Sequence, residues 1–178
     1  MNSTHEDELA IRTLVERMGE GWAHGDADEY AAVFAEDARY VNAPGTRVVG
    51  RQAIADSHRK IFRTVFAQTH LGRSYPSELQ WLTPDVALLH AAGSVLFATD
   101  TEEKVPPNGL ITMVAVRGAS GWELASFNNT QTGKARNLFF LLRYLRSRLG
   151  AMRAEWRRGR HHMMENKRRR LAMWNKSS

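Results

Sequence analysis

The order of the expected elements predicts an α+β fold: a curled antiparallel sheet, or cone, with three helices in the N-terminal half that enclose a pocket. Two observations predict this fold. Apolar residues recur with helical spacing in three segments up to Phe66. After Phe66 the period becomes that of strands, and segments rich in Val, Leu, Phe and Trp follow one another without an intervening helix. Consecutive strands joined by short turns pair antiparallel, so we expect an antiparallel sheet.

Three helices are expected from the spacing of apolar residues. The first has its apolar stripe at Ile11, Leu14, Val15, Met18 and Trp22, which lie on one helical face. Gly25-Asp26 ends this helix, and either Asp26 or Asp28 caps a second, short helix. The third helix is expected at about Arg51–Phe66, directly after Gly50.

The expected strands are bounded by turn residues. Two short strands, Arg39–Asn42 and Arg47–Val49, flank the turn Ala43-Pro44-Gly45. The four longer strands are expected at Glu78–Leu82, Val86–Phe97, Leu110–Arg117 and Trp122–Thr130. Segments rich in Pro, Asp, Asn and Gly separate them.

Charge divides the chain into two parts. Residues up to Gly133 contain 11 Lys and Arg against 17 Asp and Glu, whereas residues from Lys134 onward contain 14 against 2. We therefore expect a domain at 5–133 and a basic C-terminal helical extension at 134–178. Leu and Met recur in this extension with helical a/d spacing, which predicts a basic amphipathic helix. Such a helix can bind an acidic protein surface or an anionic membrane. Nucleic acid is the least favoured partner, because aromatic residues are not interleaved among the basic ones.

Composition excludes several classes of protein. With 43% hydrophobic and 25% charged residues, the chain has the composition of a soluble globular protein. The absence of cysteine excludes disulfides and thiolate chemistry. No apolar run approaches the roughly 18 residues of a membrane-spanning helix. The first residues are acidic, unlike an export signal, so we expect a cytoplasmic protein.

Alternation along the strands predicts a pocket. In Val86–Phe97 it places His90 and Ser94 on one face, after Val86 and Leu88. In the last strand it places Asn128 on the same face as Leu124 and Ser126. An apolar stretch followed by small polar groups is typical of a ligand pocket, so we expect this face to turn inward.

The opposite face of the long strands is also apolar. Its residues are Ala87, Leu89, Ala91, Val95 and Phe97. A second apolar face needs its own cover, and we expect a homodimer through it.

Further candidates come from the helices and the first strand. His58 lies in the middle of an apolar helical face, and Tyr40 and Asn42 share one face of the first strand. A simpler interpretation applies to each of them. A buried histidine with one backbone partner is common, and Trp22 and Met18 are more often core residues than ligand contacts.

Several short segments resemble a known family. They are Gly25-Asp26, FAEDARYV at Phe34–Val41, GRQAI at Gly50–Ile54 followed by His58, PDVALLH at Pro84–His90 and WELASFNNT at Trp122–Thr130. In this order they resemble the nuclear-transport-factor-two-like (cone fold) superfamily, and within it the SnoaL-like group of the SgcJ/EcaC type. The resemblance covers about residues 8–131 and implies the cone fold, a hydrophobic ligand and a dimer.

The resemblance also shows which chemistry is missing. Ketosteroid isomerases share this fold, and matching their pattern puts Asn42 at the general base, Met18 at the tyrosine and Thr112 at the protonated acid. None of these residues can replace its counterpart, so we do not expect that isomerase mechanism. Many SgcJ/EcaC-type sequences have histidine where this chain has Asn128. His58 and His90 are left as the titratable candidates for the pocket.

The chain has no HExxH metal motif, no GxGxxG nucleotide motif and no GxSxG nucleophile elbow, and we expect no cofactor. The family resemblance implies our leading hypothesis, a pocket protein of bacterial secondary metabolism, such as antibiotic biosynthesis. It would act on a hydrophobic, polyketide-like compound by cofactor-free acid–base chemistry, as a cyclase, isomerase or dehydratase. The expected catalytic residues are His90 and His58, and the expected ligand contacts are Trp22, Tyr40, Asn42, Ser94, Thr112 and Asn128. The alternatives are a non-catalytic binder or chaperone of a metabolite, or a dimeric adaptor that works through its basic tail.

Overall fold

The computed structural model describes residues 5–72, 76–98, 100–103, 105 and 107–132. The backbone separates into two units, residues 1–133 and 134–178. The described helices and strands all belong to the first unit, and the helix predicted for the basic tail lies outside the described residues.

The three predicted helices are present. They are α1 (His5–His24), α2 (Ala27–Ala31) and α3 (Arg51–Phe62). All five residues of the predicted stripe on α1 are buried. The carboxylate of Asp26 caps α2 by accepting hydrogen bonds from the backbone N–H groups of Asp28 and Glu29. α3 ends four residues earlier than predicted, and turns follow it. In the described part of the chain, every helix is too short or too polar to cross a membrane.

The main sheet has six strands in the order β2-β1-β8-β7-β5-β4. Their bounds are β1 Phe34–Val41, β2 Arg47–Val49, β4 Pro76–Thr83, β5 Val86–Gly93, β7 Gly109–Gly118 and β8 Gly121–Gln131. All neighbours pair antiparallel except β1 and β8, which pair parallel. The sheet is therefore mixed rather than purely antiparallel. The expectation from consecutive strands does not apply to this pair, because β1 and β8 are the first and last of the described strands and are not consecutive in the chain.

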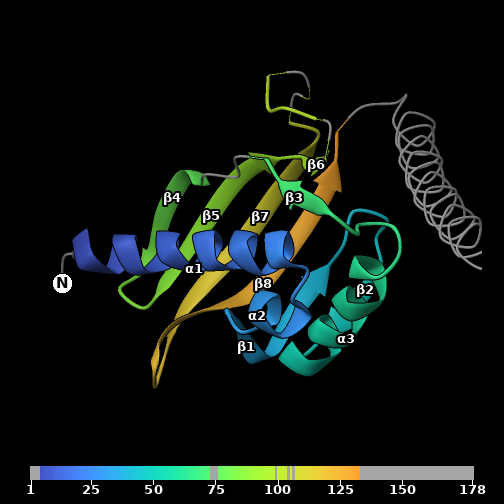
Figure 1. Cartoon of the computed structure of the whole chain (residues 1–178). Helices are drawn as coiled ribbons and strands as arrows, with labels where there is room; N and C mark the ends of the chain where they lie inside the picture. The colour runs from blue at the N-terminus through green and yellow to red at the C-terminus, as the bar shows by residue number, and fades with distance from the viewer. Residues whose placement is uncertain (1–4, 73–75, 99, 104, 106, 133–178) are drawn as a thin grey trace, which may run out of the picture. The chain divides into compact units, whose positions relative to one another are not determined.

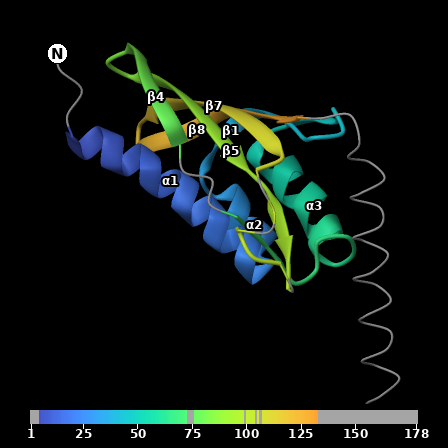
Figure 2. The same cartoon turned by 90° about the horizontal axis from the view of Figure 1, so that it is seen from above.

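The strand predicted at Val86–Phe97 is broken at Ser94. β5 stays in the main sheet, whereas β6 (Val95–Phe97) pairs with β3 (Thr69–Leu71), which was not predicted. Figure 1 shows α1 and β3 in front of the same face of the main sheet, and Figure 2 shows α1 and α2 together on that side. We refer to this covered face as the inner face.

The inner face is formed by the odd-numbered residues of β5 and β7. The buried members are Ala87, Leu89, Ala91, Ile111, Met113 and Ala115. The prediction that the face bearing His90 turns inward is therefore wrong: His90 lies on the outer face and is partly exposed. Alternation could not decide between two apolar faces. Alanines let the helices approach closely, and this favours the odd-numbered set as the covered face.

A β-bulge in β8 changes which of its side chains point inward. Val114 pairs with Ser126 but Ala115 pairs with Leu124, so Ala125 is an extra residue. Trp122 and Leu124 are buried before the bulge and Phe127 is buried after it. Because the alternation is displaced by one residue, Asn128 points outward and is exposed. The predicted inward position of Asn128 is wrong.

Candidate functional site

Three polar side chains meet in the interior, each from a different element. Tyr30 comes from α2, Tyr40 from β1 and His58 from α3, and all three are buried. The hydroxyl oxygens of Tyr30 and Tyr40 are 3.0 Å apart, and the Tyr40 hydroxyl is 3.3 Å from Nε2 of His58. Nδ1 of His58 is 2.8 Å from the carbonyl oxygen of Ile54. We refer to Tyr30, Tyr40 and His58 as the buried trio.

The carbonyl of Ile54 fixes the direction of these hydrogen bonds. A carbonyl oxygen only accepts, so Nδ1 of His58 must carry the proton and Nε2 must accept. The hydroxyl of Tyr40 then donates to Nε2, and the hydroxyl of Tyr30 donates to the oxygen of Tyr40. Protons therefore point from Tyr30 through Tyr40 towards His58.

Burial keeps the trio uncharged. It lowers the pKa of His58 to about 4, against the smaller raising effect of the hydrogen bond to Ile54. It raises the pKa of Tyr40 to about 12 and raises that of Tyr30 as well. Both phenols are therefore protonated and the imidazole is neutral near pH 7.

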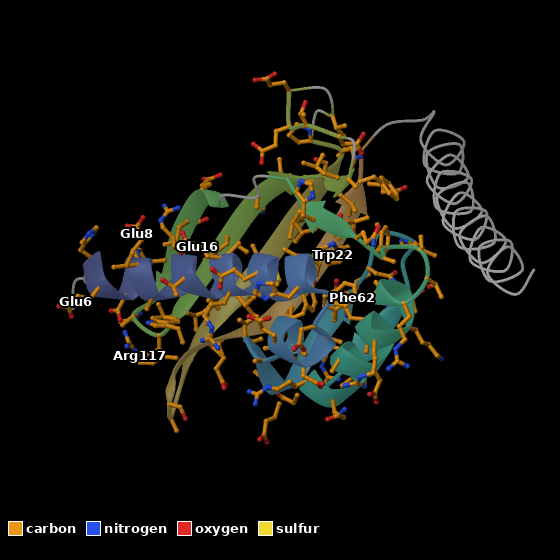
Figure 3. All side chains as sticks on the ribbon, in the orientation of Figure 1. Glu6, Glu8, Glu16, Trp22, Phe62 and Arg117 are labelled. Carbon is orange, nitrogen blue, oxygen red and sulfur yellow. The ribbon has the colours of Figure 1, made fainter. Side chains whose placement is uncertain are left out.

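An aromatic shell surrounds the trio. Its members are Trp22, Phe34, Phe62, Phe66 and Phe127. The rings of Tyr40 and Phe127 are stacked with centroids 4.6 Å apart, and those of Tyr30 and His58 are stacked at 4.1 Å. Figure 3 shows Trp22 beside Phe62, whose ring centroid lies 5.1 Å from that of the indole. These rings form a largely apolar, ring-lined environment around a few polar atoms.

The aromatic shell reaches the surface at an apolar rim. Ile61, Phe66, Leu71 and Val95 are partly exposed and pack against the core. They come from α3, the turn after it, β3 and β6. The indole of Trp22 next to this rim is held in place, since its Nε1–H donates to Oγ1 of Thr69 at 3.0 Å.

Asn129 is a further polar residue of the inner face. It follows Phe127 by two residues on β8, after the bulge, and therefore lies on the same side. Its Oδ1 is buried and makes no hydrogen bond with any described residue. Sequence analysis missed Asn129 because alternation without a bulge puts Asn128 in its place. It also missed Tyr30, whose only signal was its position in the predicted second helix.

The structure brings three of the predicted site residues together and separates the others. Trp22, Tyr40 and His58 meet in the interior. The other five do not join them.

His90, Thr112 and Asn128 instead form a row across the outer face, where His90 is the register partner of Thr112 and Thr112 of Asn128. Asn42 stabilises the turn before β2, since its Oδ1 accepts from the backbone N–H of Thr46 at 2.8 Å. Ser94 lies at the corner between β5 and β6.

Within the described residues, no group of three or more His, Cys, Asp or Glu side chains is arranged to hold a metal ion. This statement does not extend to His161 and His162, which lie outside the described residues.

The family model for the SnoaL-like domain matches residues 3–128. No curated protein matches the chain in sequence. Among solved structures, a domain of unknown function with a cystatin-like fold from Nostoc punctiforme is 24% identical with a TM-score of 0.66. The match covers 87% of this chain and 99% of that one.

Two proteins from Novosphingobium aromaticivorans are also similar in fold. A nuclear-transport-factor-two-like protein is 23% identical with a TM-score of 0.56, over 76% of this chain and 89% of that one. A protein named as a candidate scytalone dehydratase is 16% identical with a TM-score of 0.56, over 72% of this chain and 85% of that one. At these identities the similarity establishes the fold alone.

Proposed function

The chain belongs to the SnoaL-like domain family, and from this membership and the geometry of the interior we propose that the domain binds a hydrophobic, ring-containing small molecule. The molecule binds on the inner face beside the aromatic shell and enters at the apolar rim. The observation that carries the proposal is the buried trio, three hydrogen-bonding side chains inside a shell of aromatic rings. An apolar site with a few convergent polar groups is typical of ligand binding.

Binding is favoured over acid–base catalysis in the interior. A general base must accept a proton near the working pH, and burial lowers the pKa of His58 to about 4. Nε2 of His58 is also engaged by Tyr40. We therefore assign His58 and Tyr40 to shaping the polar end of the site. Cyclisation, isomerisation or dehydration of a polyketide-like compound would require another group.

A catalytic role for His90 stays a prediction. Because His90 lies on the outer face, catalysis by His90 requires a substrate that binds to that face rather than in the interior. The similarity in fold to the candidate scytalone dehydratase is compatible with an enzymatic function. Turnover assays with His90→Ala would test the catalytic role of His90.

We also propose a homodimer, with the outer face as its interface. Three of the apolar residues first expected to need a second subunit, Ala87, Leu89 and Ala91, are buried on the inner face. The outer face has its own apolar side chains, and Leu88, Val114 and Val116 remain partly exposed on it. Sedimentation at micromolar concentration should give twice the monomer mass, and a clean monomer would contradict this proposal.

Native mass spectrometry of the protein purified from its own cells tests the binding proposal. We expect an added mass that denaturation releases. In a second assay, Nile red is titrated and its fluorescence reports an apolar site. Leu71→Trp at the rim should weaken Nile red binding at least about tenfold, which corresponds to about 1.4 kcal/mol.

Leu110→Trp is the matched control, since Leu110 is exposed on the outer face. It should leave the affinity for Nile red unchanged. If the protein carries no added mass and the two variants bind Nile red alike, the interior is not a binding site.

A further inference from the structure

We propose that the Asn129 amide oxygen is the polar anchor of this site. Its ligand is then an uncharged molecule that donates one hydrogen bond from a hydroxyl or N–H group. This inference rests on the proposed function and specifies the chemical class of the ligand.

The position of Asn129 follows from the bulge at Ala125. Asn129 lies two residues beyond Phe127 on the same face of β8, which puts it about 7 Å further along the strand. Phe127 is the residue that stacks on Tyr40 of the buried trio. The amide is therefore next to the aromatic shell, on the side where β1 has already ended.

Gly109 makes room for the amide. A Cβ atom built on Gly109 would lie 2.8 Å from Oδ1 of Asn129, closer than real contacts allow. The amide oxygen thus lies directly over the backbone of β7. A neighbouring backbone group, the carbonyl of Gly93, is itself an acceptor and cannot supply the missing proton.

The missing hydrogen bond indicates what the ligand must bring. Bulk water does not reach Oδ1, and no described residue donates to it. Leaving a buried acceptor unpaired is unfavourable, so a ligand that donates a proton to it gains affinity over one of the same shape that does not.

The rest of the interior argues that the ligand is uncharged. Apart from the two tyrosines of the buried trio, the buried polar side chains among the described residues are His58, Thr69 and Ser94. No Lys or Arg is available there to pair with an anion, and no Asp or Glu to pair with a cation. A free acceptor at Asn129 adds repulsion against a carboxylate.

Three naphthalenes of nearly the same size test hydrogen-bond donation and charge separately. 2-Naphthol donates a hydrogen bond, 2-methoxynaphthalene cannot, and 2-naphthoate is an anion. Calorimetric titration of the full chain should give affinities in that order. We expect 2-naphthol to bind about tenfold more tightly than 2-methoxynaphthalene, with no measurable binding of 2-naphthoate.

Two neighbouring asparagines give a matched pair of variants. Asn129→Leu removes the inward acceptor and should equalise the affinities for 2-naphthol and 2-methoxynaphthalene. Asn128→Leu changes the exposed neighbour on the outer face and should keep the tenfold ratio. Gly109→Ala leaves Asn129 in place but pushes its amide away, and should also reduce the ratio.

The outcomes distinguish a failure of the proposed function from a failure of the inference about Asn129. If none of the three compounds binds and Nile red does not bind either, the proposed function fails. If 2-naphthol and 2-methoxynaphthalene bind the wild-type protein alike, or 2-naphthoate binds as tightly, the site stands but this inference is wrong. The wild-type ratio decides this even if Asn129→Leu does not fold.

Discussion

The hydroxyl of Tyr40 donates its proton to Nε2 of His58 across 3.3 Å, and the imidazole can accept it only while it is neutral. Protonation of His58 would make both ring nitrogens donors. Tyr40 would then have to become an acceptor from His58 and turn its own proton towards Tyr30. The buried trio therefore links the charge of one imidazole to the packing of α2, β1 and α3.

Stability should fall as the pH drops below about 6.5. The pKa of His58 is about 4 in the folded protein and 6.5 when it is exposed, so between these values the unfolded state binds the proton and the folded state does not. The stability that depends on neutral His58 is fully present above about pH 6.5 and is lost progressively as the pH falls to about 4. The loss is about 3 kcal/mol, since each pH unit is worth about 1.4 kcal/mol.

Urea unfolding of the wild type and of His58→Gln across this pH range would measure the effect. Carboxylates titrate in the same pH range and affect both proteins alike. Their effect cancels in the difference between the two free energies of unfolding. We expect the wild type to lose stability relative to the variant as the pH falls. A difference that does not change with pH would contradict the neutral, buried state of His58.

The middle position of Tyr40 in the buried trio predicts unequal effects of two Tyr→Phe substitutions. Tyr40→Phe removes the donor to His58 and the acceptor of Tyr30, so it leaves two buried groups unpaired and should cost about 2–3 kcal/mol. Tyr30→Phe removes one donor and should cost about 1 kcal/mol. Thermal or urea unfolding would measure both.

The double variant is the control for coupling between the two hydroxyls. Once Tyr40 is replaced, the hydroxyl of Tyr30 has lost its acceptor, so removing it as well should add nothing or restore some stability. If Tyr30→Phe costs more than Tyr40→Phe, Tyr40 does not connect Tyr30 to His58 as described.

Sequence patterns predicted the elements of the fold better than the faces they present. The stripe on α1 is buried as expected, and β2 has its predicted bounds of Arg47–Val49. Periodicity is a local property, and these elements need no knowledge of what packs against them. Three residues carry no measurable period; β2 was indicated by the turn Ala43-Pro44-Gly45 before it, and no such turn precedes β3.

The candidate site was predicted only in part, for two physical reasons. Both faces of β5 are apolar, and the choice between them depends on which allows the helices to approach. The face predicted for His90 was therefore the wrong one. The bulge at Ala125 exchanges the facing of Asn128 and Asn129, and a bulge has no signature in the alternation itself. Trp22, Tyr40 and His58 were identified because none of them depends on either choice.

Two glycines of α1 should respond to alanine in opposite directions. A Cβ atom on Gly21 would lie 2.4 Å from the backbone nitrogen of Tyr30, whereas one on Gly19 would have nothing within 4 Å. Gly21→Ala forces α2 away from α1 and should destabilise the protein by about 1–3 kcal/mol. Gly19→Ala removes only the backbone freedom of glycine and should stabilise it by about 0.5–1 kcal/mol.

Melting temperatures of the two variants would check this pair. Because α2 carries Tyr30, Gly21→Ala should also weaken Nile red binding, and Gly19→Ala should not. Equal melting temperatures for both variants would mean that α1 and α2 do not pack as closely as described.

Asp7 joins the start of α1 to the far end of β7 and β8, and its two roles can be separated. Its Oδ1 accepts from Nε1 of Trp122 at 3.0 Å, and its Oδ2 lies 2.8 Å from the guanidinium of Arg117. Arg117 also lies over the Trp122 ring, 4.6 Å from its centroid. Asp7→Asn keeps an acceptor for Trp122 and loses only the ion pair, whereas Asp7→Ala loses both.

We expect Asp7→Asn to cost less than about 1 kcal/mol, because Arg117 is 39% exposed and water screens the pair. Asp7→Ala should cost about 1–3 kcal/mol, since it leaves the largely buried indole N–H of Trp122 unpaired. Urea unfolding at low and high salt would distinguish the two contributions. Salt should reduce the small difference between the wild type and Asp7→Asn, but should leave the difference between Asp7→Asn and Asp7→Ala unchanged. If both variants lose the same stability, the ion pair rather than the indole holds the end of α1 on the sheet.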